Sequence, residues 1–288
     1  MNFRKLKIFY ETATSLNMTE VGRKLYISQP SVSQAIKEIE IETGARLFDR
    51  IGKRLYLTYE GELYLKYVNR VLNLHNEALT LLNDCKNNIK GRIRIGASTT
   101  IGSCFLPKII KEFLDENKNI DIVITIGNSE EVENKLLNNE VDIGFIEGNV
   151  LSKELIVDYS WKDELVFIGF KGANEKNEYD LLNRFIMREK GSGTRQIIEN
   201  YLNSKNIDYK ISMELGNVEA IIQLVEVGLG ISCVPFRAVS SKLEKGDIEV
   251  LNIINEENIK RDFKLIYHQD KFLSETICSF IKKSKEFE

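Results

Sequence analysis

The 288-residue chain is poor in the residues that build metal sites and disulfide frameworks. Its four cysteines, Cys85, Cys104, Cys233 and Cys278, stand singly, with no CxxC pair and no neighbouring histidine. Zinc sites and disulfide-stabilised folds need closely spaced groups of such residues. The sequence therefore predicts neither, and we expect reduced thiols and a protein without a metal or another cofactor.

Long hydrophobic runs are also missing. No uninterrupted apolar stretch approaches the roughly 18 to 20 residues needed to cross a bilayer, and the first ten residues are charged where a signal peptide would be apolar. We therefore expect a cytoplasmic protein with no membrane partner. Hydrophobic residues at 43% and charged residues at 29% are typical of globular proteins, and the length favours two domains with a connector.

The motifs of common enzyme classes are absent from the sequence. It contains no GxxxxGK[ST] loop, no HExxH, no recognisable pair of catalytic carboxylates and no Ser-His-Asp set. His75 and His268 are its only imidazole groups. The sequence therefore predicts that the protein is not an enzyme.

Charge is distributed unevenly along the chain. The first 90 residues hold 14 Lys and Arg against 10 Asp and Glu, a net charge of +4, which leaves −7 for the remainder. A modestly basic end on an acidic body is typical of a protein with a small nucleic-acid contact surface.

The basic end has the pattern of a helix-turn-helix. A helical stripe from Leu6 is followed by Asn17 and Glu20, which predict a helix start, and Ile27 to Pro30 predict a turn into a third helix. The polar face of that third helix suits a DNA major groove. Its exposed residues are Gln29, Ser31, Ser33, Gln34 and Lys37.

Two further elements complete this end. Two short strands around Gly52 predict a wing, in which Arg50, Lys53 and Arg54 hold the phosphate backbone. A long helix over about residues 59–88 follows, with apolar residues spaced 3, 4, 3, 4 and 3 apart. These residues are Leu65, Val68, Leu72, His75, Leu79 and Leu82. We expect this seam to pair two copies of the chain into a dimer that meets a symmetric DNA site.

The sequence here closely resembles the LysR-type transcriptional regulators. The resemblance is carried by SQPSVSQAIK at residues 28–37, GARLFDR at 44–50 and LTYEG at 57–61, and it covers essentially the whole chain. It implies that Gln29, Pro30, Ser33, Gln34 and Lys37 lie on the DNA face and that Arg50 lies in the wing. It also implies an inverted-repeat operator, a homotetramer, and an effector domain with the fold of periplasmic solute-binding proteins.

We therefore expect an α/β protein of three parts. A winged helix-turn-helix domain covers residues 1–58, a linker helix 59–89, and a two-lobed effector domain 90–288. One lobe takes residues 90–162 and 268–288 and the other 163–267, with crossings near 161–164 and 267–269. Strands in parallel sheets are predicted at 92–96, 120–127, 141–146, 164–170, 185–188, 211–215, 230–234, 249–253 and 263–268.

Two segments of the acidic body predict a site for a small anion. Ser98, Thr99 and Thr100 follow the first strand and open a helix, while Ser192, Thr194 and Arg195 do the same after the strand at 185–188. Both would face the cleft between the lobes. The LysR resemblance adds Asn128 and Ser129 to the contacts and points to relatives that sense small sulfur- or phosphorus-containing metabolites.

Other functions stay open at this stage. A solute-binding protein would leave residues 1–88 unexplained. A redox-sensing regulator would use Cys104, which the sequence places in the helix that opens the predicted site, where a helix start favours a thiolate.

Overall fold

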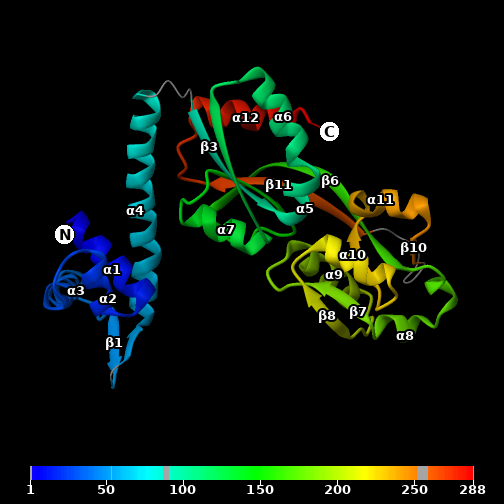
Figure 1. The fold of residues 1–288 in the computed structure, drawn as a ribbon, viewed down its shortest axis with the longest axis horizontal. Coiled ribbons are helices and arrows are strands. Elements are labelled where there is room, and N and C mark those ends of the chain that lie inside the picture. Colours follow the sequence, from blue (N-terminus) through cyan, green and yellow to red (C-terminus); the bar gives the residue numbers. More distant parts are fainter. Residues whose placement is uncertain (1, 53, 87–90, 252–258, 288) are drawn as a thin grey trace. The chain divides into compact units, whose positions relative to one another are not determined.

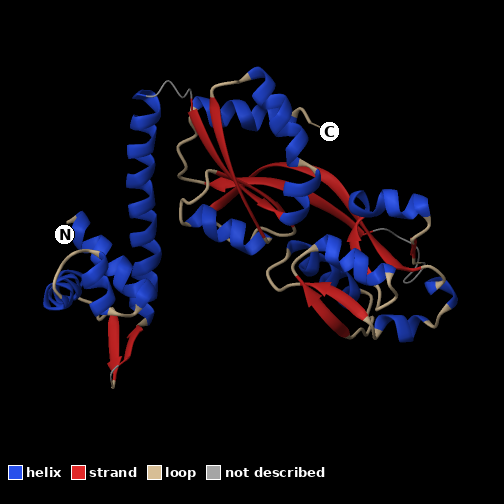
Figure 2. Cartoon of the chain, in the orientation of Figure 1, coloured by secondary structure: helices blue, strands red, loops and turns tan. Residues whose placement is uncertain are grey.

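The computed structural model describes residues 2–52, 54–86, 91–251 and 259–287. It divides into two units, residues 1–83 and 84–288, and each is described by itself. The first unit consists of helices and one hairpin, and the second alternates strands and helices, as Figures 1 and 2 show. We call the first unit the head.

Three short helices form the body of the head: α1 (Phe3–Ser15), α2 (Met18–Lys24) and α3 (Gln29–Thr43). Asn2, Asn17 and Ser28 cap them through their side chains, which accept backbone N–H groups that have no partner within the helix. Apolar residues of all three helices pack around Phe9, which is fully buried. The predicted helix-turn-helix is therefore confirmed.

The wing is the hairpin of β1 (Phe48–Ile51) and β2 (Arg54–Leu57). Gly52 lies in its turn with φ of 62°, a left-handed conformation that glycine adopts without strain. The Glu40 carboxylate on α3 accepts hydrogen bonds from the backbone N–H groups of Leu47 at 2.9 Å and Phe48 at 3.2 Å. These two bonds fix the hairpin to α3.

The predicted seam of the long helix α4 (Tyr59–Lys86) is wrong in part. Val68 and Leu72 are buried in the core of their own head, because α4 packs against it, and His75 stacks on Phe3 with ring centroids 4.3 Å apart. Leu79 and Leu82 of the predicted seam are exposed. Six exposed apolar residues of α4 form a stripe with spacings of 4, 4, 3, 4 and 4. This α4 stripe consists of Leu63, Tyr67, Val71, Leu74, Ala78 and Leu82.

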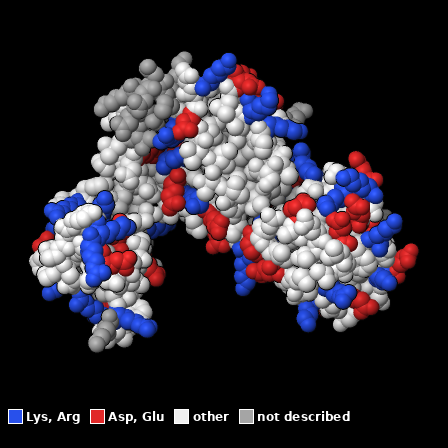
Figure 3. Space-filling view, viewed as in Figure 1, with Lys and Arg blue, Asp and Glu red and all other residues white. Residues whose placement is uncertain are grey.

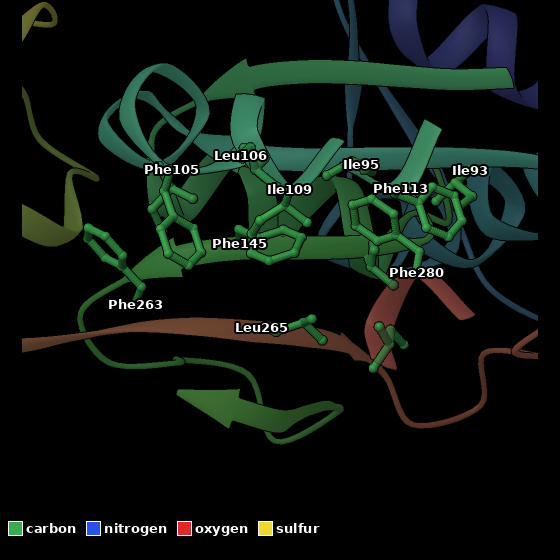
Figure 4. Close-up of a cluster of buried hydrophobic side chains, with 14 of the residues drawn as sticks. Ile93, Ile95, Phe105, Leu106, Ile109, Phe113, Phe145, Phe263, Leu265 and Phe280 are labelled. Carbon is green, nitrogen blue, oxygen red and sulfur yellow. The ribbon is translucent and has the colours of Figure 1, made fainter. Parts of the chain in front are cut away.

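In the second unit, the first lobe is built on three parallel strands. They are β3 (Gly91–Ser98), β4 (Ile120–Gly127) and β5 (Ile143–Glu147). The helices of this lobe are α5 (Thr99–Cys104), α6 (Leu106–Glu116), α7 (Ser129–Leu137) and α12 (Glu275–Lys285). Figure 4 shows part of its core, where the Phe113 and Phe280 rings meet edge to face with centroids 5.0 Å apart.

Two long antiparallel strands, β6 (Leu155–Phe170) and β11 (Ile259–His268), run through both lobes (Figure 1). Leu265 and Phe263 belong to the core of the first lobe and Ile259 to that of the second. The chain therefore returns to the first lobe near Arg261, and our expectation of a crossing at 267–269 was wrong. Arg261 pairs in register with Asp163, which lies within the other expected crossing.

The second lobe surrounds the far halves of these two strands. Strands β9 (Ser232–Pro235) and β10 (Ile248–Val250) pair antiparallel with β6, and β7 (Phe185–Arg188) pairs parallel with β8 (Ile211–Leu215). Residues 252 and 253 of the strand expected at 249–253 lie outside the described residues. The helices are η1 (Ala173–Glu175), α8 (Glu178–Leu182), α9 (Gly193–Ser204), α10 (Val218–Glu226) and α11 (Phe236–Lys245).

A buried ion cluster fastens the C-terminal segment to the first lobe. The Asp142 carboxylate lies 2.6 Å from Arg94 Nη2 and 2.6 Å from Lys271 Nζ, and it also accepts the Arg94 backbone N–H at 2.7 Å. Burial by itself raises the pKa of Asp142. The hydrogen bond from Arg94 and the charges of Lys271 and Arg94 outweigh burial, so the pKa lies below its ordinary value.

We expect Asp142→Asn to destabilise the effector unit by about 3 kcal/mol at pH 7, because the buried Lys271 and the half-buried Arg94 lose their counter-charge. The pKa of Asp142 is lower in the folded protein than in the unfolded chain, where it is about 3.9. The ionised Asp142 therefore stabilises the fold fully above that unfolded value, and this stabilisation is lost as the pH falls through the folded pKa. The difference between variant and parent should therefore shrink in acid. Urea unfolding followed by fluorescence of Trp161, the single tryptophan, measures it.

Asp115→Asn is the matched control, since Asp115 pairs with Lys111 at the surface, with side chains 65% and 76% exposed. It should change stability by well under about 1 kcal/mol. Equal losses in the two variants would show that the Asp142 cluster does not hold the lobe together.

Candidate functional sites

The polar face of α3 lies on the surface of the head as expected. Gln29, Pro30, Ser31, Gln34 and Lys37 are exposed and Ser33 is half-buried, whereas Val32, Ile36 and Ile39 are buried beneath them. The amide of Gln34 donates to Glu38 at 3.0 Å, and the Ser31 hydroxyl contacts that of Ser28 at 2.8 Å. These side chains present donors and acceptors of the kind that bind base edges and phosphates.

The wing joins this face through Arg50. Its Nη2 lies 3.4 Å from Ser33 Oγ on α3 and 3.3 Å from Met18 Sδ on α2. Arg54 is exposed on the second strand, and Lys53 lies outside the described residues. Figure 3 shows basic side chains near the tip of the hairpin.

A hollow of about 660 Å³ lies between the wing and the start of α2, lined by Gln29, Arg50 and Arg54. Asn17, Thr19 and Tyr56 also line it, and we did not predict them. The alternation of the β2 strand, with Leu55 and Leu57 half-buried, places Tyr56 on the outer face and could have indicated it.

In the effector unit, the predicted anion-site residues fall into two groups. Ser129, Ser192 and Arg195 line an open pocket of about 360 Å³ between the lobes. Two of the predicted side chains close to it act as helix caps: Asn128 accepts the Glu131 N–H at 2.9 Å, and Ser192 accepts the Arg195 N–H at 3.4 Å. The two lobes touch beside this pocket, where the Glu130 N–H donates to the Gly191 carbonyl at 3.2 Å.

Arg195 differs from what we expected of a free donor. Its Nε donates to Glu199 at 2.7 Å, and its Nη1 donates to Glu214 at 2.6 Å and to the Arg188 carbonyl at 3.0 Å. The guanidinium therefore ties α9 to β8, and its charge is already balanced by two carboxylates.

The second group is buried. Ser98 and Thr100 are 2% and 4% exposed, and no hydrogen-bond partner for either hydroxyl lies within the described residues. Thr99 directs its hydroxyl to the Gly127 carbonyl at 3.5 Å. Thr194 is 1% exposed and accepts a hydrogen bond from Arg261 Nη1 at 2.8 Å.

Sequence reasoning missed three charged residues next to this buried group. Arg261 lies 2.6 Å from Asp163, and Nη1 of the same arginine lies 4.0 Å from Glu147 Oε1. A signal was present, because Arg261 shares the alternation of the inward-facing Phe263 and Leu265.

Cys104 does not have the surroundings of a reactive thiol. It ends α5 instead of starting it, so the favourable helix start that we expected is absent. The Cys104 side chain is exposed, yet partial desolvation, and then the negative charge of Asp163, raise the pKa of its thiol despite Arg237 and Arg261 nearby. Because the thiolate is the reactive form, the site disfavours the redox alternative.

Two family models together match nearly the whole chain. The bacterial regulatory helix-turn-helix protein, lysR family, matches residues 3–62, and the LysR substrate binding domain matches residues 86–287. The chain belongs to the LysR family. This LysR protein is thus a transcriptional regulator with a DNA-binding head and an effector-binding domain, and its family comprises regulators and not enzymes.

Similar proteins agree with this assignment. The uncharacterized HTH-type transcriptional regulator YeiE of Escherichia coli K12 is 34% identical over 286 residues, which cover 98% of this chain and 96% of YeiE. A probable RuBisCO transcriptional regulator of Phaeodactylum tricornutum is 32% identical over 295 residues, with 98% and 96% covered.

Solved structures show the same fold. Full-length CbnR in complex with its target DNA superposes with a TM-score of 0.69 at 20% identity, covering 99% of each chain. The regulatory domain of Synechocystis CcmR, in complex with 2-PG, has a TM-score of 0.62 at 28% identity, covering 68% of this chain and 97% of that domain.

Two further kinds of feature are absent from the part of the chain that the structure describes. None of the helices there is both long and apolar enough to cross a membrane. The same residues contain no cluster of three or more His, Cys, Asp or Glu side chains that could hold a metal ion.

Proposed function

We propose that this LysR regulator binds an inverted-repeat operator as a dimer or tetramer. A small anionic effector, such as a carboxylated metabolite, binds between the lobes of residues 90–288 and controls this contact. The DNA-binding half of this proposal rests on the hydrogen bond from Arg50 to Ser33. It holds a phosphate-binding side chain of the wing against the helix face that suits the major groove.

The residues of the head divide into two roles in this proposal. Those on α3 contact base edges and set the sequence preference, whereas those on the wing hold phosphates and fix the register. The first set is Gln29, Pro30, Ser31, Ser33, Gln34 and Lys37. The second set is Arg50, Lys53 and Arg54.

The two sets should respond differently to substitution. Gln34→Ala should weaken binding to the preferred operator by about 1 to 3 kcal/mol and hardly change binding to random DNA, because a base-edge contact is lost. Arg50→Ala should weaken both and flatten the salt dependence, because a phosphate contact is lost. Fluorescence anisotropy at several salt concentrations measures both effects.

Lys111→Ala is the control for net charge, since Lys111 lies on the surface of the effector unit. It should leave operator binding unchanged. Equal losses for Gln34→Ala on operator and random DNA would exclude the groove assignment.

We propose that the α4 stripe pairs two copies of the chain. Its Leu63, Leu74 and Leu82 are 50%, 60% and 63% exposed, and a helix of 28 residues with such a continuous apolar stripe buries it by packing against a second helix. Pairing through this stripe leaves the head core intact, because Val68 and Leu72 lie on the other face of α4.

Leu63→Asp together with Leu74→Asp should convert the protein into monomers, because the pairing would bury unpaired charges. Operator affinity should fall at least about 100-fold, since each monomer meets only half of a symmetric site. Light scattering after size exclusion measures the assembly.

Leu72→Asp is the contrasting variant. It should lower the melting temperature of the head, which the stripe variant should leave nearly unchanged, because only Leu72 is a core residue. A stripe variant that stayed assembled and bound operator normally would show that α4 has another partner.

The effector site that we propose combines both lobes. Its first wall consists of Ser98, Thr99, Thr100, Asn128 and Ser129, and its second of Ser192, Thr194 and Arg195. The buried hydroxyls of Ser98 and Thr100 support a polar ligand, because buried polar groups in folded proteins are almost always hydrogen-bonded. The similarity to the CcmR regulatory domain, whose structure contains 2-PG, supports a small-molecule effector.

A thermal-shift screen of sulfate, phosphate and small carboxylic acids should give at least one compound that raises the melting temperature of the full chain. Thr100→Val keeps the side-chain shape and removes one hydroxyl, so calorimetry should show binding weaker by about 1 to 3 kcal/mol. DNA binding without the compound should stay nearly the same.

Ser160→Ala removes an exposed hydroxyl from β6 and serves as the control. If Thr100→Val bound every active compound as tightly as Ser160→Ala does, the effector would bind elsewhere.

A further inference from the structure

Buried polar atoms without a hydrogen-bond partner concentrate at one place in the effector unit. Six such side-chain atoms occur within the described residues, and five of them belong to the carboxyl edge of β3 and β5 and to the adjoining β6–β11 pair. These five atoms are Ser98 Oγ, Thr100 Oγ1, Glu147 Oε1, Asp163 Oδ1 and Arg261 Nη2. We call the five residues the buried polar group.

The sheet register brings this group together. Ser98 ends β3 and Glu147 ends β5, and these strands are neighbours with Ala97 opposite Phe145. Glu147 pairs with Phe263 on the next strand, two residues from Arg261. Neighbouring strands lie about 4.8 Å apart, and Arg261 Nη1 lies 4.0 Å from Glu147 Oε1. Ser98 ends the adjoining strand β3.

Helix α5 covers the same place. It contacts β5, which ends in Glu147, and α11, which carries Arg237. Thr100 is buried on this helix, at 4% exposure. Its hydroxyl therefore belongs to the helix that covers this edge of the sheet.

The charges of the group are already balanced. Arg261 Nε bonds to Asp163 Oδ2 at 2.6 Å, Arg237 Nε lies 3.3 Å from Asp163 Oδ1, and Glu147 is the second carboxylate. Within the described residues, Asp163 Oδ1 keeps only this ion-pair contact with Arg237, and Glu147 Oε1, Arg261 Nη2 and the hydroxyls of Ser98 and Thr100 have no hydrogen-bond partner. A simple oxyanion could accept from the guanidinium and the hydroxyls but would meet two carboxylate oxygens with no hydrogen to give them.

We infer that the effector of this site is a zwitterionic amino acid, an inference that rests on the proposed function and names its ligand class. The ammonium group donates to Glu147 Oε1 and Asp163 Oδ1. The carboxylate accepts from Arg261 Nη2 and from the hydroxyls of Ser98 and Thr100. Every unbonded atom of the buried polar group then has a partner of the correct type.

This arrangement also links the ligand to both lobes. Ser98, Thr100 and Glu147 belong to the first lobe, while Arg261 Nη1 donates to Thr194 at the start of α9 in the second. A ligand held between them favours the lobe arrangement in which both sides reach it.

The test uses the full chain and the twenty standard L-amino acids as probes in a thermal-shift screen, followed by calorimetry. At least one amino acid should raise the melting temperature. The 2-hydroxy acid with the same side chain should bind at least tenfold more weakly, because a hydroxyl carries no charge and donates one hydrogen instead of three.

Glu147→Gln keeps the shape of the side chain and lets the amide oxygen accept from Ser129 Oγ, which lies 3.4 Å from Oε2. It places an NH₂ donor where the ammonium group needs an acceptor, so it should weaken amino-acid binding at least tenfold. Asp115→Asn, at the surface of the effector unit, is the control and should bind as the parent does. Urea unfolding followed by Trp161 fluorescence checks that both variants are folded.

Binding of sulfate, phosphate or 2-hydroxy acids as tightly as any amino acid would overturn the inference and leave the proposed effector function in place. Unchanged amino-acid affinity in Glu147→Gln would overturn the role of the buried polar group alone. If neither amino acids nor the acids of the earlier screen bound, both proposals would fail.

Discussion

The effector unit depends on the buried ion pair of Arg261 and Asp163 at the point where its two lobes are joined. Both side chains are almost completely inaccessible, at 0% and 1% exposure, so neither charge can be hydrated, and each needs the other. The pair lies opposite in register on β6 and β11, the strands that run through both lobes. Arg261 also lies over the ring of Phe263, with its guanidinium carbon 5.1 Å from the ring centroid, which connects the charged group to the core of the first lobe.

Close backbone approach gives the lobes a second point of contact. A Cβ at Gly193 would overlap the carbonyl of Glu147, and the Cα of Gly193 lies 3.1 Å from the Cβ position that Gly148 lacks. The start of α9 can therefore reach the end of β5 only because both positions are glycine. Residues that are neighbours in sequence therefore have different surroundings: Ser192 lines the open pocket, and Thr194 bonds to Arg261.

In the head, two faces of the single helix α4 have different roles. One face of α4 completes the core through Val68 and Leu72, and the opposite face carries the exposed α4 stripe. A seven-residue repeat in the sequence cannot separate these two faces, because both consist of apolar residues three or four positions apart. Apolar residues three or four positions apart therefore indicate packing within one chain and pairing between two chains equally well.

The sequence by itself determined the helix-turn-helix, the wing and most strands, because capping residues, turn glycines and hydrophobic periodicity act over a few neighbouring residues. It also determined the LysR family through the motif at residues 28–61. Only the tertiary structure decided which face of α4 is buried, where β11 returns to the first lobe, and that Arg195 is bound by Glu199 and Glu214. It alone placed Arg261 beside Asp163, 98 residues away in sequence. Burial of a charge depends on the partner that the fold brings to it, and a partner so distant leaves no local pattern.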